Sequence, residues 1–197
     1  KKFSKFKNLK KLYKDKISLE LISIIFPELK NLKVFSRLNS NIEEILDEND
    51  FIFLLSLMII DDSDNADYFL YKFNISKKNQ KRIKIVDNFF KERTTSKTFS
   101  ENNLNKIFYY HGKQAVLDIL NFKLIRSGKL NSSILDLIKQ YKNRLIPNLP
   151  VGANYLMEKF QISEGKQLGV KLKAIEEEWV KNDFKISEKE INNIVNS

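Results

Sequence analysis

The residues best placed for chemistry lie in the stretch ISEGKQLGVKLKAIEEEW at 162–179. Its apolar residues recur every three or four positions, so they share one face of a helix and leave the charges on the other face. They are Leu168, Leu172, Ile175 and Trp179. Ser163 is expected to cap this helix. The free backbone amides near Gly165 and Lys166 favour a bound phosphate, and Lys171 adds positive charge. A capped helix that only packs fits the same pattern, so both interpretations stay open.

Residues suited to catalysis are few. The chain has no Cys and one His, His111, so thiol chemistry and histidine-rich metal sites are excluded, and His111 is expected at a helix end beside Gly112. Asp62 and Asp64 in DDSDNAD have a spacing that can hold Mg²⁺, but helix capping and solvation explain these carboxylates more simply. There is no phosphate-binding loop and no dinucleotide-binding motif. We therefore expect neither a catalytic residue nor a metal ligand in this chain.

The elements that must position these groups are helices. The 197 residues include only 5 Gly and 3 Pro, too few for the tight turns of an all-β protein, and long runs have helical periodicity. We expect an all-α protein with a multi-helical body at 1–146 and a smaller helical tail at 147–197. Two of the three Pro cluster near this boundary in RLIPNLPVGAN, as is typical of a linker.

The helices are expected near residues 3–14, 18–25, 29–38, 41–48, 50–60, 65–73, 77–91, 101–110, 112–125, 131–145, 153–159, 165–181 and 187–195. Ser187 and Glu190 have the spacing of a capping box at the start of the last one. The longest apolar run, FIFLLSLMII at 51–60, is about half as long as a membrane-spanning helix. It is therefore expected as a buried core helix, and no membrane partner is expected. A cytoplasmic location is expected as well, with which the absence of Cys is consistent.

Positive charge is the strongest feature of the composition. The formal net charge is +10, with 30% charged and 42% hydrophobic residues, a balance typical of a folded globular protein. The first 16 residues, KKFSKFKNLKKLYKDK, hold eight Lys and one Asp with apolar residues interleaved at helical spacing. Such a basic amphipathic helix suits a polyanion or an acidic surface. A solvated helix face in a lysine-rich protein fits it equally well.

The segment LPVGANYLMEKFQISEGKQLGVKLKAIEEEWVKNDF resembles the carboxyl-terminal tail of bacterial tRNA nucleotidyltransferases, the CCA-adding enzymes and their poly(A) polymerase relatives. The matching positions are Pro150, Gly152, Leu156, Met157, Ile162, Gly165, Leu168, Gly169, Leu172, Glu176 and Trp179. Shorter segments at 19–35, 67–86 and 109–125 also resemble parts of the family's body. The sequence departs from the family where Glu164 and Lys166 replace two Pro and Gln161 replaces a Gly.

The resemblance implies an RNA-binding body and tail that position the 3′ end of tRNA or another RNA for addition of CCA or poly(A). The catalytic head and its base-selecting motif are not in this sequence. The chain alone is therefore expected to have no activity and no cofactor, whereas a full-length parent enzyme would use Mg²⁺ with CTP or ATP. The RNA-binding candidates are Lys77, Lys78, Lys81, Arg82, Gly165, Lys166 and Lys171. The alternative is a stand-alone helical module that binds a protein or an acidic surface.

Overall fold

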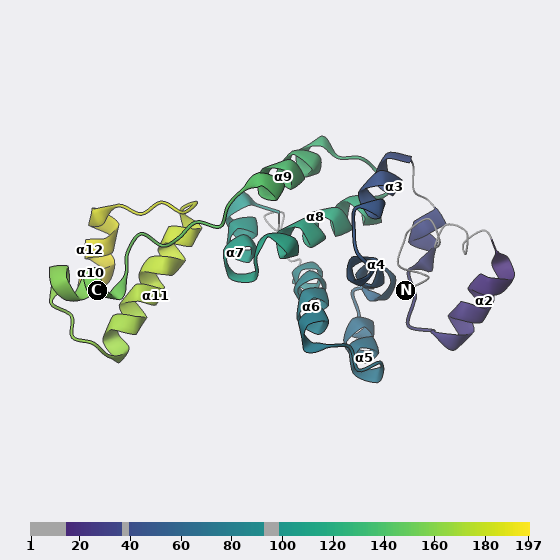
Figure 1. The fold of residues 1–197 in the computed structure, drawn as a ribbon, viewed down its shortest axis with the longest axis horizontal. Coiled ribbons are helices and arrows are strands. Elements are labelled where there is room, and N and C mark those ends of the chain that lie inside the picture. Colours follow the sequence, from purple (N-terminus) through teal and green to yellow (C-terminus); the bar gives the residue numbers. More distant parts are fainter. Residues whose placement is uncertain (1–14, 37–39, 93–98) are drawn as a thin grey trace. The chain divides into compact units, whose positions relative to one another are not determined.

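The computed structural model describes residues 15–36, 40–92 and 99–197 (Figure 1). These residues form eleven α-helices and one 3-10 helix, and they contain no strand. The expected all-α fold is thus confirmed. The helix expected at 3–14, and with it nearly all of the basic segment at 1–16, lies outside the described residues. No helix within the described part is both long enough and apolar enough to cross a membrane.

The chain divides into two compact units by its internal contacts. The first comprises Lys1–Thr94 and Ala115–Asn143, and the second comprises Thr95–Gln114 and Arg144–Ser197. The second unit thus combines the carboxyl-terminal segment with a helix from earlier in the chain. The expected boundary between 146 and 147 stays a prediction.

The first unit is a bundle of short helices. They are α2 (Lys16–Ile25), η1 (Leu32–Ser36), α3 (Ser40–Asp47), α4 (Phe51–Ile59), α5 (Asn65–Lys72), α6 (Lys77–Lys91), α8 (Lys113–Ser127) and α9 (Ser132–Asn143). The apolar run at 51–60 forms α4, which is buried from Phe53 to Ile59 and packs on η1, α5 and α6. It is the core helix that the sequence predicts. Phe90 of α6 and Phe122 of α8 join this core, with ring centroids 4.7 Å apart.

One expected helix of this unit is not formed as predicted. The segment at 29–38 was expected to be α-helical, but its described part contains only the 3-10 helix η1. Asn31 explains the difference, because its backbone N–H donates to Met58 at 3.0 Å and its side chain donates to the Ile60 carbonyl at 2.5 Å. These bonds to α4 and its end replace bonds within a regular α-helix.

The second unit consists of α7 (Glu101–His111), α10 (Ala153–Phe160), α11 (Lys166–Lys181) and α12 (Glu188–Asn196). Helix α11 packs on the other three. Leu168 and Ile175 of α11 lie in a cluster with Leu156 and Ile191. Further along α11, the Trp179 ring contacts Tyr109 at 5.3 Å and Phe184 at 5.0 Å between centroids. The apolar face predicted for 165–181 is therefore the face that organises this unit.

Candidate nucleic-acid interface

The amino end of α11 is open. The helix begins at Lys166, and Gly165 is its N-cap with φ 150° and ψ −165°, a backbone region that is nearly exclusive to glycine. Among the described residues no side chain bonds this cap, and the first turn contains no acidic residue. The expected cap by Ser163 is therefore wrong, because the helix starts three residues after it. Residues 163–167 are exposed, which leaves the first amides facing solvent.

The two lysines predicted to act at this helix have different surroundings. Lys166 is exposed in the first turn, where its charge adds to the positive end of the helix dipole. Lys171 is half-buried, and its ammonium donates to the Ile194 carbonyl of α12 at 3.1 Å. Lys171 thus donates a hydrogen bond to a carbonyl in the last turn of α12 and stabilises the end of that helix. A phosphate at this end would be held by Lys166 and backbone amides.

Helix α6 begins in a similar way. Its N-cap, Ser76, makes no side-chain bond to the helix within the described structure, and no acidic residue lies in the first turn. Lys77, Lys78 and Lys81 are exposed. None of the described carboxylates forms an ion pair with these three lysines. This end therefore carries three positive charges that no nearby carboxylate neutralises.

Arg82, the fourth candidate on α6, is bound inside the first unit. Its guanidinium donates through two nitrogens to Asp118 of α8, one of these bonds being 2.9 Å, and through the third to Asp50. Asp118 is only 1% exposed, and Asp50 also caps α4 by accepting from the Phe53 amide at 3.0 Å. Burial lowers the pKa of Arg82, but the bonds to Asp118 and Asp50 outweigh burial and raise it. Arg82 thus links α4, α6 and α8 and is not presented to a ligand as the lysines are.

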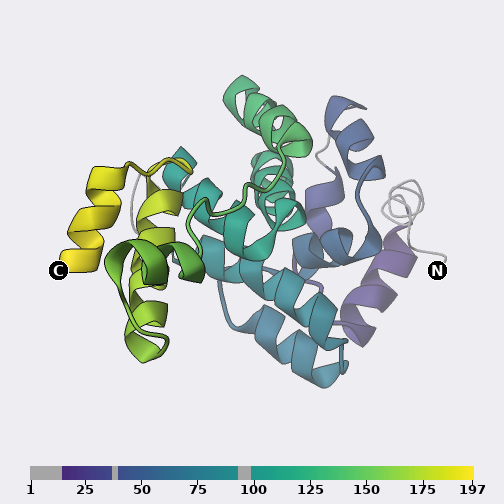
Figure 2. The ribbon, with the colours of Figure 1, turned by 60° about the vertical axis from the view of Figure 1, so that its left-hand side comes forward.

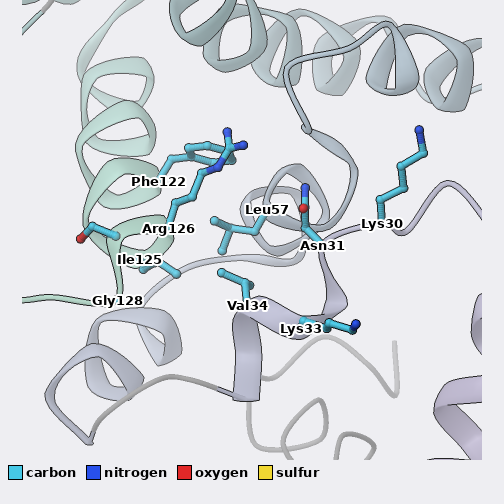
Figure 3. Close-up of a pocket in the computed structure, with 10 residues that line it drawn as sticks. Lys30, Asn31, Lys33, Val34, Leu57, Phe122, Ile125, Arg126 and Gly128 are labelled. Carbon is cyan, nitrogen blue, oxygen red and sulfur yellow. The ribbon is translucent and has the colours of Figure 1, made fainter.

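A pocket of about 310 Å³ opens elsewhere in the first unit (Figure 3). Its lining combines apolar and basic side chains, namely Lys30, Asn31, Lys33, Val34, Leu57, Phe122, Ile125, Arg126, Ser127 and Gly128. Lys30 is paired with Asp61 at 3.1 Å. Arg126 lies over the Phe122 ring at 5.7 Å and binds both oxygens of Asp62 at 3.0 and 2.9 Å. Because carboxylates neutralise these two cations, the pocket is a weaker site for an anion than the start of α6.

The acidic loop does not assemble a metal site. Asp62 pairs with Arg126, whereas Asp64 lies 3.4 Å from the ammonium of Lys91. Within the described residues no three His, Asp or Glu side chains come close enough to hold a metal ion. His111 is the last residue of α7, and Gly112 with φ 84° follows as its C-cap, which is the helix end that the sequence predicts. These residues provide ion pairs and helix ends.

Two exposed tyrosines were missed by the sequence analysis. Tyr68 and Tyr71 of α5 are 56% and 87% exposed, whereas Phe69 and Leu70 between them are buried. Their spacing in the sequence could have indicated this exposure. Tyr68 and Tyr71 are three residues apart and so share one face of the helix, whereas Phe69 and Leu70 lie on a different face. Large aromatic side chains on the solvent-exposed face of α5 mark a surface that can bind another molecule.

Comparison with models of protein families gives a match that covers most of the chain. The family model of tRNA nucleotidyltransferase domain 2 matches residues 43–195. This range contains every RNA-binding candidate from Lys77 to Lys171. No curated protein and no solved structure matches the chain.

Proposed function

This chain belongs to the tRNA nucleotidyltransferase domain 2 family, and from this premise we propose that it binds tRNA or another RNA and positions the RNA 3′ end for nucleotide addition. The feature that carries the proposal is the exposed basic start of α6. There, Lys77, Lys78 and Lys81 are exposed and have no carboxylate partner among the described residues. The start of α11, with Gly165 and Lys166, supports it as a second uncapped basic helix end.

Both helix ends suit the RNA backbone for the same physical reason. The first amides of a helix have no partner within the helix, and the helix dipole favours negative charge at that end. An exposed lysine beside them adds a mobile positive charge that can meet a phosphate oxygen. The formal net charge of +10 adds a long-range attraction that weakens as salt rises. Phosphate contacts of this kind hold RNA without reading its sequence.

The role proposed for these residues is positioning. Nucleotidyl transfer needs Mg²⁺ with CTP or ATP at a pair of converging carboxylates, whereas Asp62 and Asp64 have separate cationic partners here. Such chemistry would come from a catalytic head that the resemblance implies and these residues do not supply. Holding the RNA 3′ end in place contributes to the rate by converting an encounter into an oriented complex.

Two assays test the proposal together. The purified chain should bind tRNA at low salt, and Lys77→Gln/Lys78→Gln/Lys81→Gln should weaken binding while the helical circular dichroism signal stays unchanged. The chain supplied with Mg²⁺ and CTP or ATP should add no nucleotide to the RNA. Failure to bind tRNA at low salt would refute the proposed role. Nucleotide addition would restore Asp62 and Asp64 as catalytic candidates.

A second candidate function rests on α2. Ile17, Leu21, Ile24 and Ile25 of this helix are 72%, 53%, 70% and 60% exposed, and α2 contains no buried residue. An aliphatic face of this kind favours the alternative of a helical module that binds a protein. A chain that fails to bind RNA but forms a complex that Leu21→Glu abolishes would support this alternative.

A further inference from the structure

Helices α5 and α6 lie side by side as an antiparallel hairpin (Figure 2). Ion pairs join the two helices, because Asp67 binds Lys84 at 2.8 Å and Lys91 at 3.6 Å, and Asp64 lies 3.4 Å from Lys91. The start of α5 thus lies beside the last two turns of α6, and the two helices run antiparallel. This half of the hairpin, away from the connecting turn, has its lysines matched by carboxylates.

The half nearer the turn is different. One helical turn beyond Asp67 on α5 is Tyr71, which therefore belongs to the same half of the hairpin as Lys77 and Lys81 at the start of α6. Lys77, Lys81 and Lys84 are spaced four and three residues apart, so they share one face of α6. Lys84 has a partner in Asp67, but Lys77 and Lys81 pair with none of the described carboxylates. This half of the hairpin therefore combines an exposed aromatic ring with positive charges that no described carboxylate neutralises.

We propose that one surface of the α5–α6 hairpin binds an unpaired stretch of RNA. This surface, here named the hairpin platform, consists of Tyr68, Tyr71, Lys77, Lys78 and Lys81. A base stacks on the ring of Tyr71, and the lysines contact the adjoining phosphates. This combination of an aromatic face and a basic track is what single-stranded nucleic acid requires, since every base offers a flat surface and every linkage offers a charge. The inference rests on the proposed RNA-binding function and specifies the form of RNA that this surface takes.

Unpaired RNA fits the platform better than duplex RNA. Bases in a duplex are already stacked on their neighbours, so a surface tyrosine cannot reach a base face there. Lysines alone could contact the phosphates of a duplex equally well, and binding of a duplex would not explain why the Tyr71 ring is 87% exposed. Of the two tyrosines, Tyr71 is the better stacking residue, because the ammonium of Lys72 already lies 5.8 Å from the ring of Tyr68.

Tyr110 of the second unit provides a matched contrast. It is 47% exposed, but it shares its surroundings with Glu176 and Glu177. Burial and these two carboxylates raise the pKa of its hydroxyl. Three lysines, Lys106, Lys173 and Lys181, line the same hollow, but Lys173 and Lys181 pair with Glu177 and Glu178 at 3.9 and 3.0 Å. An exposed ring is thus present there beside lysines that carboxylates largely neutralise. Tyr110→Ala is therefore a control for removing an exposed ring from a surface that should not bind RNA.

The test measures the affinity of the full chain for a fluorescent single-stranded RNA of twelve nucleotides, about the length that one binding module covers, and for a duplex of the same sequence. Tyr71→Ala should weaken single-strand binding by about fivefold or more, whereas Tyr71→Phe keeps the ring and should bind like the parent. Duplex binding should change by less than about twofold, because base stacking is not involved. Tyr110→Ala should leave single-strand binding unchanged.

The possible failures are distinguishable. If the parent binds tRNA but Tyr71→Ala binds the single strand equally well, or loses both probes equally, the platform inference is wrong and the proposed function stands. If the parent binds no RNA, both are wrong, and a protein partner becomes the better explanation of the exposed ring. Thermal melting of each variant should match the parent, because Tyr71 makes little buried contact at 87% exposure.

Discussion

The amino ends of α11 and α12 belong to the same unit but are built in opposite ways. At α12 the Glu190 amide donates to the Ser187 hydroxyl at 3.3 Å, and the Ser187 amide donates to the Glu190 carboxylate at 2.7 Å. The first turn of α12 is acidic, as the helix dipole favours. At α11 the cap is Gly165, the first residue is Lys166, and no described side chain bonds the cap. One end satisfies its own amides, and the other leaves them to solvent or a ligand.

The two helix ends are therefore expected to have different roles, one in the stability of the fold and the other in binding. A backbone amide that already donates to a cap is not available to a phosphate, so α12 uses its amino end to stabilise the fold. Helix α11 obtains its stability from its buried face and leaves its amino end open. Changes at α12 should therefore alter unfolding, and changes at the start of α11 should alter RNA affinity.

The largest effect is expected from the buried face of α11. Trp179 is 2% exposed and contacts the rings of Tyr109 and Phe184. Trp179→Ala should lower the free energy of unfolding by about 3–5 kcal/mol, because it removes a large ring and leaves a cavity. Urea denaturation measures this change, and Trp179→Phe should lose less. A loss below about 1 kcal/mol would contradict the assignment of α11 as the central helix of this unit.

The next effect concerns binding and tests the open end directly. Lys166→Glu should lower tRNA affinity at low salt by about fivefold or more, or about 1 kcal/mol, because it places negative charge against a phosphate. Lys189→Glu makes the same charge change in the first turn of α12, in the same unit. It should have a much smaller effect if the open end matters. Equal losses in the two variants would mean that only the total charge counts.

A smaller effect is expected at the closed end. Ser187→Ala removes the side-chain half of the capping box and should lower the free energy of unfolding by about 1 kcal/mol. Ser163→Ala is the matched control, since Ser163 is exposed and does not cap α11. The melting temperature should fall for Ser187→Ala and should stay unchanged for Ser163→Ala. Similar shifts in both would contradict the difference between the two helix ends.

The smallest effect is a pH dependence of the closed end. Hydrogen bonds from the Ser187 side chain and backbone lower the pKa of Glu190 below its usual value of 4.5. A carboxylate with a lowered pKa stabilises the fold fully above its unfolded pKa and loses this contribution as pH falls through the folded pKa. The stability difference between the parent and Glu190→Gln should therefore be constant near neutral pH and shrink below pH 4.5. A difference that grows on acidification would contradict the capping box.

Local patterns made part of this structure predictable. The apolar spacing in 162–179 predicts the buried face of α11, and the spacing of Ser187 and Glu190 predicts the capping box that α12 has. In both patterns, successive residues are three or four positions apart, which is about one helical turn, and at this range sequence distance determines spatial distance. For the same reason the helical class of the protein could be inferred from periodicity alone.

Interactions between distant segments could not be predicted in this way. Arg82 resembles the lysines beside it in sequence, but its guanidinium meets Asp118, which is 36 residues away. The cap of α11 was misplaced because the positive φ of Gly165 ends the preceding segment and starts the helix later than the Ser163 pattern suggests. The antiparallel packing of α5 on α6, which brings Tyr71 to the same half of the hairpin as the lysines, also depends on ion pairs between separate helices.

The salt dependence of tRNA affinity tests the central claim most directly. It should be measured for the parent chain and for Lys77→Gln/Lys78→Gln/Lys81→Gln. If these lysines contact phosphates, the slope of the logarithm of affinity against the logarithm of salt concentration should become shallower by about 2–3 in the variant, since each phosphate contact contributes about 0.7–0.9. Equal slopes for the two proteins would show that these lysines do not meet the RNA backbone and would contradict the proposed interface.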